Sequence, residues 1–517
     1  MGVLKSRSAH PPVVTAEVRD VARLRRRLPD DRPWELILAV VVGAVLRLHR
    51  LGAESLWIDE VFTVSMATEF SLRELLFEVP TFEPHPPLYN ALMWGWVGLT
   101  GTSEAMVRLP SVAFSIATIP VLYLLVRRLF DRPTAAVATL LLAISPLQIW
   151  YAQEARMYAL LVLLTVVSAY LLLGLVESYD RRVAVAYVLV GALLGYTHVY
   201  GLFVLLAQGL FAAWVGYRPA ASTGWTVRRV GGLYGAIGLL TAPWTGLLVH
   251  RTLAPERYPP DVMAWLGPPD AAALVETFSL FAFGTTSTTR PYSVLSHPPE
   301  PFVLVVALTL VFVGGFYTLG AFDDHRRSLL FVTLWTVVPV VVPFALSFVI
   351  QPMYELRYVI VAAPAFLVLV SLGVSVISLR HVRYGLLGLV VVGMLIPLPG
   401  YYAEPHKDQW EDAADLVEAS VDSDDVIIVV PGWTWEGPSD AFRYYFDRDD
   451  VAIHPIYDGS PDEAYADAVA DGDDVYLVLS YTNRRAATIE RVSELTGSEP
   501  TERHDLVGVV VVRFESG

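Results

Sequence analysis

Long apolar blocks, separated by short polar segments, run through the first 400 residues of this chain. Val303–Val313 and Val337–Val349 are examples, and a block of about 18 apolar residues is long enough to cross the hydrocarbon core of a bilayer. Hydrophobic residues make up 54% of the chain and charged residues only 17%, against about 25% in a typical soluble domain. One soluble core cannot bury so many apolar blocks. The sequence therefore predicts an α-helical protein that crosses the membrane many times.

The apolar pattern predicts eleven spans, and the basic residues predict their direction. The spans are placed at 33–50, 109–127, 134–150, 157–176, 183–198, 199–217, 230–249, 301–321, 328–350, 358–379 and 384–400. Lys and Arg are enriched in cytoplasmic loops. With eleven spans every basic cluster falls on that side: the tail 1–32, Arg127–Arg128–Arg132, Arg181–Arg182, Arg218 with Arg228–Arg229, Arg326–Arg327, and Arg380 with Arg383. We therefore expect a multi-pass cell-membrane protein with a cytoplasmic tail (1–32), a transmembrane domain (33–403) and an outer C-terminus.

The segment 85–101, HPPLYNALMWGWVGLTG, decides this orientation because it is apolar enough to be a further span. If it crossed the membrane, Arg127–Arg128 and most later basic clusters would lie outside. We favour a position along or partly within the outer membrane surface, since its paired prolines and its aromatic residues Tyr89, Trp94 and Trp96 suit an interface.

Residues 404–517 predict a separate soluble α/β domain. Strand-like runs at 426–430, 451–456, 475–480 and 507–514 alternate with helix-like runs at 410–421, 462–470 and 484–495. Residues 401–517 contain 27 acidic and 8 basic residues, a net charge of −19, whereas the preceding residues carry +4. Such an acidic domain argues against nucleic-acid binding. The chain has no cysteine, which excludes disulfides, thiolate metal sites and a cysteine nucleophile.

Five polar motifs fall at the outer ends of spans or in the first outer loop of this arrangement. They are Trp57-Ile58-Asp59-Glu60, Glu83-Pro84-His85-Pro86-Pro87, Gln153-Glu154-Ala155-Arg156, His198-Val199-Tyr200 and Tyr354-Glu355-Leu356-Arg357. Motifs from distant parts of the chain that meet on one face are typical of a site built at the membrane surface. We therefore expect a functional site there.

The charged residues of these motifs suit a general base and a phosphate clamp. Asp59 can act as a base at the interface, although such an acid is more often a solvated loop residue or a helix cap. Arg156 and Arg357 can bind phosphate oxygens in a bidentate manner, although arginines at span ends also commonly snorkel toward headgroups. Two arginines opposite the basic clusters favour phosphate binding. His85 and His198 show no local metal-binding spacing, and a divalent ion held by Glu60, Glu83 and a histidine remains a weaker alternative.

The runs LGAESLWIDEVFTV, EPHPPLYNALMWGW, SPLQIWYAQEARMYAL and YELRYVIVAAPAF, in this order, resemble the GT-C membrane glycosyltransferases. The resemblance is to glycosyltransferase family 39, which includes dolichyl-phosphate-mannose–protein mannosyltransferases and aminoarabinose transferases. It covers most of 33–420, and the segment HKDQWEDAADLV resembles the start of the soluble C-terminal domain in such proteins.

The resemblance implies an enzyme that transfers a sugar, with inversion, from a polyprenyl or dolichyl phosphate on the outer side of the membrane. It implies that Asp59 is the catalytic base, that its motif neighbour Glu60 is a second candidate catalytic residue, and that His85, Arg156 and Arg357 lie at the donor phosphate. In the aminoarabinose branch the position of His85 is a lysine. Candidate substrate-binding residues are Glu154, His198, Tyr200 and Tyr354. The expected partners are the lipid-linked donor, membrane lipid, and a glycan, lipid or protein acceptor.

Two other functions are open to a chain of this kind. A transporter or flippase of lipid-linked sugars would bury ionisable residues near the bilayer midplane and often show inverted repeats, but here the charged motifs lie at span ends. A non-catalytic scaffold would leave Asp59, Arg156 and Arg357 without a role. The absence of a Gly-rich phosphate loop fits a donor without a nucleotide. The chain also lacks the Trp-Trp-Asp signature of oligosaccharyltransferases, which argues against transfer of a whole glycan to asparagine.

Overall fold

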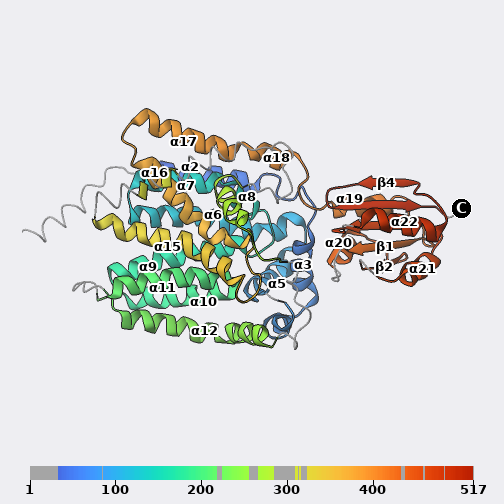
Figure 1. Ribbon diagram of the computed structural model, residues 1–517, viewed down its shortest axis with the longest axis horizontal. Coiled ribbons are helices and arrows are strands. Elements are labelled where there is room, and N and C mark those ends of the chain that lie inside the picture. The colour runs from blue at the N-terminus through green and yellow to red at the C-terminus, as the bar shows by residue number, and fades with distance from the viewer. Residues whose placement is uncertain are drawn as a thin grey trace, which may run out of the picture.

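The computed structural model describes residues 33–83, 85–217, 224–254, 266–284, 309–311, 314–315, 323–431, 437–457, 460–482 and 484–515. A bundle of long helices forms its larger part, and a smaller domain with a β-sheet lies at one end of the bundle (Figure 1). The expected architecture, a helical membrane domain followed by a C-terminal α/β domain, is confirmed.

The helices of the bundle occupy the apolar blocks of the sequence. They are α2 (Trp34–Leu48), α6 (Glu104–Leu129), α7 (Arg132–Ile144), α8 (Pro146–Trp150), α9 (Tyr158–Glu177), α10 (Arg181–Thr197), α11 (Tyr200–Tyr217), α12 (Val227–Leu253), α13 (Ala272–Phe283), α15 (Asp323–Leu346), the 3-10 helix η5 (Tyr358–Ala362), α16 (Ala363–Ser375), α17 (Arg380–Leu395) and α18 (Pro397–Ala403). Polar caps set several of their starts: the side chains of Asp131, Asp180 and Thr226 accept backbone hydrogen bonds at the beginnings of α7, α10 and α12.

Seven helical segments of the described part are long and apolar enough to cross a membrane. They are α6, α9, α11, α12, Arg326–Leu346 within α15, Tyr358–Ser375 and Arg380–Ala403. Three further predicted spans correspond to shorter helices, the 15-residue α2, the 13-residue α7 and the 17-residue α10. The predicted span 301–321 lies largely outside the described residues. A membrane protein is therefore confirmed, and the number of spans stays a prediction.

The two ends of the bundle differ in chemistry. At one end Glu35 accepts hydrogen bonds from Tyr123 at 2.6 Å and from Arg132 at 2.6 Å, and Arg128 pairs with Glu177. This end holds basic residues that the sequence assigns to the cytoplasm. At the other end α18 leads into the sheet domain, and all five outer motifs of the sequence lie there or in the adjoining loops (Figure 1).

The first long connection lies at this second end and contains α3 (Ile58–Glu69), α4 (Leu72–Phe77), the 3-10 helix η2 (Val79–Thr81) and α5 (Leu88–Thr100). Helix α4 begins with a capping box between Ser71 and Glu74. The segment 85–101 therefore forms a short helix, α5, which packs against α3 at the end of the bundle (Figure 1). This 13-residue helix is not among the long apolar segments of the described part, and its expected position at the membrane interface stays a prediction.

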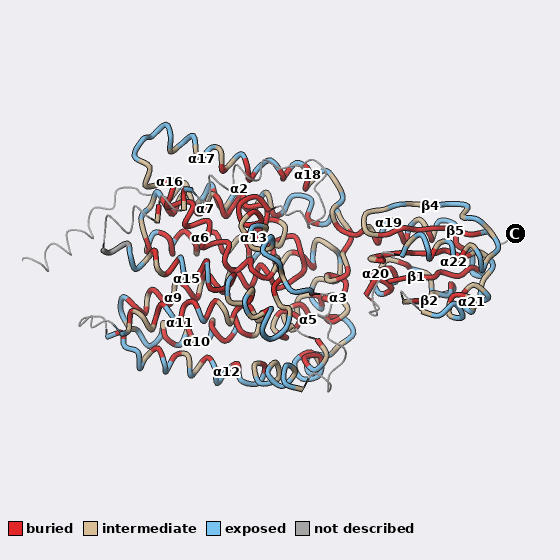
Figure 2. The backbone as a smooth tube through the Cα atoms, viewed as in Figure 1, coloured by how far each residue is buried: buried red, intermediate tan, exposed pale blue. Residues whose placement is uncertain are grey.

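The C-terminal domain contains a five-stranded sheet with the order β2-β1-β3-β5-β4. Its elements are α19 (Trp410–Glu418), β1 (Val426–Pro431), α20 (Gly437–Tyr445), β2 (Ala452–Pro455), α21 (Asp462–Ala470), β3 (Val475–Ser480), α22 (Arg485–Thr496), β4 (Glu502–Asp505) and β5 (Val509–Phe514). Strand β1 pairs in parallel with β2 and β3, whereas β5 is antiparallel to β3 and β4. The central strands are buried (Figure 2).

The predicted strands and helices of this domain are present, and two further elements were not predicted. Strand β4 has the sequence Glu-Arg-His-Asp and lies at the sheet edge, so it lacks the apolar pattern on which strand prediction depends. Helix α20 packs on α3 of the first connection and thereby joins the two parts of the protein. The residues of α20 and α3 that contact each other are almost 400 positions apart in the sequence.

Candidate active site

Asp59 lies in the first turn of α3, at the end of the bundle next to the sheet domain. Its Oδ2 atom is 3.4 Å from Nη1 of Arg357 and 3.9 Å from Nε of Arg156. The Asp59 side chain is 27% exposed, whereas that of Arg156 is 7% exposed. Asp59, Arg156 and Arg357, which were predicted from three separate motifs, therefore lie together at a partly exposed site.

The side chain of Arg156 is hydrogen-bonded to α3. Its Nη1 donates to the backbone oxygen of Asp59 and to Oγ1 of Thr63, both at 3.2 Å, and its own backbone oxygen accepts from Ser111. The buried Nε atom of Arg156 has no hydrogen-bond acceptor among the described residues. A buried guanidinium with an unmatched donor is suited to an additional anionic oxygen.

Arg357 approaches Asp59 from the other side, at the start of η5. Its Nε is 3.3 Å from Oε1 of Glu355, and its guanidinium lies over the ring of Trp57, 5.7 Å from the ring centroid. The distances from both arginines to Asp59 exceed the 2.7–2.9 Å that is usual for a strong charge-assisted bond. The carboxylate and the two cations therefore form an open arrangement rather than a closed salt bridge.

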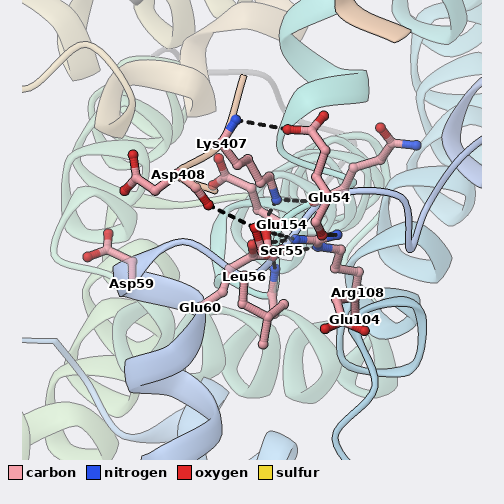
Figure 3. Close-up of polar contacts among 12 residues, drawn as sticks. Glu54, Ser55, Leu56, Asp59, Glu60, Glu104, Arg108, Glu154, Lys407 and Asp408 are labelled. Carbon is pink, nitrogen blue, oxygen red and sulfur yellow. Dashed lines mark hydrogen bonds and ion pairs between the residues drawn. The ribbon is translucent and has the colours of Figure 1, made fainter. Parts of the chain in front are cut away.

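Glu60 occupies a different environment from Asp59 although the two residues are adjacent. Its side chain is fully buried and accepts hydrogen bonds from Arg108 at 2.9 and 2.8 Å, from Nζ of Lys407 at 2.8 Å and from the backbone nitrogen of Ala155 at 2.7 Å. Burial opposes its ionisation, but Arg108 and Lys407 outweigh that effect and lower the pKa of Glu60 to about 2. Figure 3 shows the Asp59 carboxylate turned away from this cluster.

This geometry favours a positioning role for Glu60 over the catalytic role predicted for it together with Asp59. All the contacts of its carboxylate are with the protein, and no surface of the side chain is exposed. Glu60 fixes the first turn of α3 from the inside, so that Asp59 projects toward the two arginines.

A cluster of aromatic and histidine rings borders the site. Nδ1 of His85 pairs with Glu83, and the His85 ring centroid lies 5.7 Å from that of His198. The His198 ring is 4.7 Å from Tyr358 and 5.6 Å from Tyr200. The backbone nitrogen of Tyr200 donates to Nδ1 of His198 at 3.2 Å, which places the ring hydrogen of neutral His198 on Nε2. His85 and His198, predicted from separate motifs, thus lie together.

The other predicted substrate-binding residues make contacts within the protein. Oε1 of Glu154 accepts a hydrogen bond from the indole of Trp150, the Tyr200 hydroxyl donates to the backbone oxygen of Met353 at 3.0 Å, and the Tyr354 hydroxyl is 2.6 Å from Oγ1 of Thr277. Burial raises the pKa of Glu154 to about 7. These three residues shape the surroundings of the site, and their contact with a substrate stays a prediction.

No group of three or more histidine and acidic residues that could hold a metal ion is found in the described part of the chain. Glu60, one candidate ligand, is engaged by Arg108 and Lys407, and Glu83 is engaged by His85. The described residues therefore offer no assembled site of the kind that a divalent ion would need.

Two site residues were missed by the sequence reasoning, Arg108 and Lys407. Arg108 lies in the second turn of α6, where its five donor hydrogens are matched by Glu60 and by the backbone oxygens of Leu51, Glu54 and Ser55. In the sequence it directly precedes the predicted span 109–127, as an arginine at a membrane interface would, so it gave no distinct signal. Lys407 follows the last span, and its 347-residue separation from Glu60 gave no local signal.

Comparisons with known proteins agree with this architecture. Residues 84–244 match the model of the dolichyl-phosphate-mannose-protein mannosyltransferase family. The matched segment contains His85, Arg108 and Arg156, but it does not extend to Asp59 or Arg357. Comparison with curated protein sequences finds no significant match.

Several solved structures share the fold at low sequence identity. Apo ArnT from Cupriavidus metallidurans aligns with a TM-score of 0.57 and 14% identity, over 96% of this chain and 98% of that chain. The structure of the same protein bound to undecaprenyl phosphate gives 0.55 and 14%, over 92% and 97%. The apo oligosaccharyltransferase of Archaeoglobus fulgidus gives 0.52 and 14%, over 92% and 74%. The chain thus shares the fold of these structures, and its residues 84–244 are similar to the dolichyl-phosphate-mannose-protein mannosyltransferase family.

Proposed function

We propose that this protein is an inverting glycosyltransferase that moves a sugar from a polyprenyl phosphate to an acceptor hydroxyl on the extracytoplasmic side of the membrane. The observation that carries the proposal is the meeting of Arg156 and Arg357 at the Asp59 carboxylate, from three distant segments of the chain. The ArnT structure with undecaprenyl phosphate adds support, since a protein of this fold binds such a lipid.

The reaction needs a base for the acceptor hydroxyl and a cation for the leaving phosphate, and the site contains a candidate for each. Asp59 accepts the proton of the acceptor hydroxyl, whose oxygen forms a new bond to the anomeric carbon of the sugar. The bond from that carbon to the phosphate oxygen breaks on the opposite face, and both electrons of the bond leave with the polyprenyl phosphate. Arg156 and Arg357 stabilise the negative charge that gathers on the leaving phosphate. Attack opposite the leaving group inverts the anomeric carbon.

The rings beside Asp59 supply polar groups for the donor in this proposal. His85 contacts the phosphate or the sugar, since it lies next to the site and is 17% exposed at its side chain. His198 is buried with Tyr358 and Tyr200, and its Nε2 hydrogen can orient a sugar hydroxyl. Glu154 and Tyr354 lie farther back and support the loops that carry Arg156 and Arg357.

A transporter of lipid-linked sugars fits the structure less well. Arg47 and Arg108 are charged residues buried inside helices of the bundle. Arg47 donates to Ser115 and to the backbone oxygens of Gly43, Leu142 and Ala143, so its contacts are structural. Arg108 is paired with Glu60 and donates to the backbone oxygens of the loop before Asp59. The charged residues that face an open site lie at one end of the bundle, which favours chemistry at the membrane surface over transport through it.

A transfer assay tests the proposal. Full-length protein in lipid nanodiscs is given radiolabelled polyprenyl phosphates that carry a hexose or a pentose, with membrane extract as the source of acceptors. We expect label to move to an acceptor with the wild type, and to do so about 100- to 10,000-fold more slowly with Asp59→Asn. Glu69→Gln, at the far end of the same helix, is the matched control and should behave as the wild type. Equal transfer by Asp59→Asn would overturn the assignment of the base.

A further inference from the structure

The segment that joins the bundle to the sheet domain runs back along the loop that precedes Asp59 (Figure 3). Oε2 of Glu54 accepts hydrogen bonds from the backbone nitrogens of His406 at 3.0 Å and Lys407 at 2.8 Å. The Ser55 hydroxyl donates to the backbone oxygen of Asp408 at 2.9 Å. Residues 54–55 and 406–408, which are about 350 positions apart in sequence, are thus fixed to each other.

The side chain of Lys407 extends this contact into the interior. Its Nζ donates to Oε2 of Glu60 and to the backbone oxygen of Gln153, both at 2.8 Å, and the residue is 6% exposed. A buried amine is costly unless it is paired and hydrogen-bonded. Here Glu60 supplies the counter-charge, and Arg108 shares the same carboxylate. The lysine therefore belongs to the cluster that fixes the first turn of α3.

Glu60 transmits this contact to the proposed reacting groups. It is the chain neighbour of Asp59, and its Oε1 accepts from the backbone nitrogen of Ala155, the neighbour of Arg156. A displacement of Glu60 would therefore move the base and one phosphate-binding arginine together. Because misplacement by about 1 Å can cost a hundredfold in rate, the position of Lys407 matters for the reaction even though it does not touch the site.

Helix α20 of the sheet domain makes a second, independent contact with the same loop. The Tyr445 hydroxyl accepts a hydrogen bond from the backbone nitrogen of Leu56 at 2.6 Å and donates to Oε1 of Glu104 at 3.0 Å. The neighbouring Tyr444 hydroxyl donates to the backbone oxygen of Thr102 at 2.9 Å. The loop before Asp59 is thus held both by the joining segment and by the domain itself.

We infer that Lys407 is a positioning residue for the transfer reaction, and that seating of the C-terminal domain on the bundle sets the geometry of Asp59. The inference rests on the proposed function. It gives the sheet domain a part in activity although that domain carries none of the proposed reacting groups. A C-terminal domain that shifts, for example when an acceptor engages it, would alter the rate of sugar transfer through Lys407 and Glu60.

Amine labelling tests the contact without any need for turnover, because the chain has only two lysines, Lys5 and Lys407. The full-length protein is treated with an amine-reactive reagent, and labelling at each lysine is measured by peptide mass spectrometry, with the unfolded protein as the reference. We expect Lys407 to be labelled at least about tenfold more slowly in the native protein, as its burial and ion pair require. Tyr445→Phe, which removes a hydroxyl from the interface and leaves the buried charges intact, should speed the labelling of Lys407 and leave Lys5 unchanged. Native labelling of Lys407 at the unfolded rate would overturn the inference.

Kinetics separate positioning from a merely structural role. We expect Lys407→Met to lower kcat about 10- to 100-fold while the Kd for undecaprenyl phosphate, measured with the lipid alone, changes less than about threefold. Lys5→Met is the matched control and should match the wild type in both measurements. The double variant Lys407→Met/Glu60→Gln should lose less than the product of the two single losses, because both changes break the same ion pair.

Unchanged kcat in a correctly folded Lys407→Met protein would overturn the inference, and so would multiplicative losses in the double variant. If the wild type transfers no sugar from any donor tested, the proposed function fails. The labelling of Lys407 in that case still shows whether the joining segment is locked to the loop.

Discussion

Asp59 and Glu60 are consecutive residues, and their carboxylates point to different sides of the first turn of α3 (Figure 3). Successive helical residues are about 100° apart around the axis, so one carboxylate can face the open site while the next faces the core. Asp59 is 3.4 Å from Arg357, whereas Glu60 is enclosed by Arg108 and Lys407. The pair thus divides reaction and support between two neighbouring acids.

This division predicts that two conservative substitutions differ in their effect on stability. Glu60→Gln leaves Arg108 and Lys407 without their counter-charge, and breaking a buried pair in this way typically costs about 3–5 kcal/mol. We expect a clearly lower midpoint of thermal unfolding in detergent for Glu60→Gln and a nearly unchanged midpoint for Asp59→Asn. An unchanged unfolding midpoint for Glu60→Gln would contradict the supporting role of this buried ion pair.

The two arginines are expected to bind the donor phosphate jointly. A hydrogen bond to a charged group contributes about 1.5–3 kcal/mol, so Arg357→Ala and Arg156→Ala should each weaken the binding of undecaprenyl phosphate roughly ten- to a hundredfold. The double variant should lose less than the sum of the two free energies if both side chains hold one phosphate.

Arg128→Ala is a suitable control for this measurement, since Arg128 pairs with Glu177 at the opposite end of the bundle. Its affinity for the lipid should equal that of the wild type. Full affinity in both Arg156→Ala and Arg357→Ala would exclude the clamp and leave interaction with lipid headgroups as the explanation for the two arginines.

Glu154 is expected to make stability depend on pH in a defined window. Burial raises its pKa from 4.5 to about 7, and the nearby Glu60 charge acts in the same direction against the effect of Lys407. Between these values the native protein holds a proton that the unfolded chain releases, so the free energy of unfolding falls as the pH rises from about 4.5 to 7, by about 3 kcal/mol in all. In Glu154→Gln this fall should be absent.

Thermal unfolding at pH 5, 6, 7 and 8 measures the effect of Glu154. The comparison is with the wild type and with Glu494→Gln, which changes an exposed acid of the sheet domain. Parallel pH profiles for Glu154→Gln and the wild type would contradict the assignment.

The orientation in the membrane can be tested with single cysteines, because the natural chain has none. A cysteine at Ser460, in the sheet domain, should react with an impermeant thiol reagent in intact cells. A cysteine at Ser178, at the end where Arg128 and Arg132 lie, should react only after the cells are opened. The reverse pattern would show that the C-terminal domain is cytoplasmic and would make the segment 85–101 a better candidate for a span.

The long apolar blocks predicted the helical membrane domain and the bounds of most of its long helices to within several residues, and with them the end of the bundle at which Asp59, Arg156 and Arg357 meet. This prediction was possible because each of these residues lies next to a span, so the direction of the span places it. The positions of Asp59 and the two arginines were predicted in this way, from their neighbours in the sequence.

The supporting cluster was beyond the reach of such reasoning. Arg108 lies in the second turn of α6 and could be taken for an arginine at a membrane interface, and the contact of Lys407 with Glu60 depends on the path of a linker. Tyr445 lies in α20, a helix that was itself not predicted, so its hydrogen bond to Leu56 could not be foreseen. Contacts between segments far apart need the tertiary structure.

The hydrogen bond from Ser111 to the backbone oxygen of Arg156 fixes how far this residue lies from the end of α6. Helix α6 begins at Glu104, so Ser111 lies seven residues inward, about 10 Å along the helix axis at 1.5 Å per residue. Arg156 is therefore recessed below the rim formed by the end of α6. Arg156 is 6% exposed, and in such surroundings, poor in water, attraction between a guanidinium and a phosphate is several times stronger than in bulk solvent.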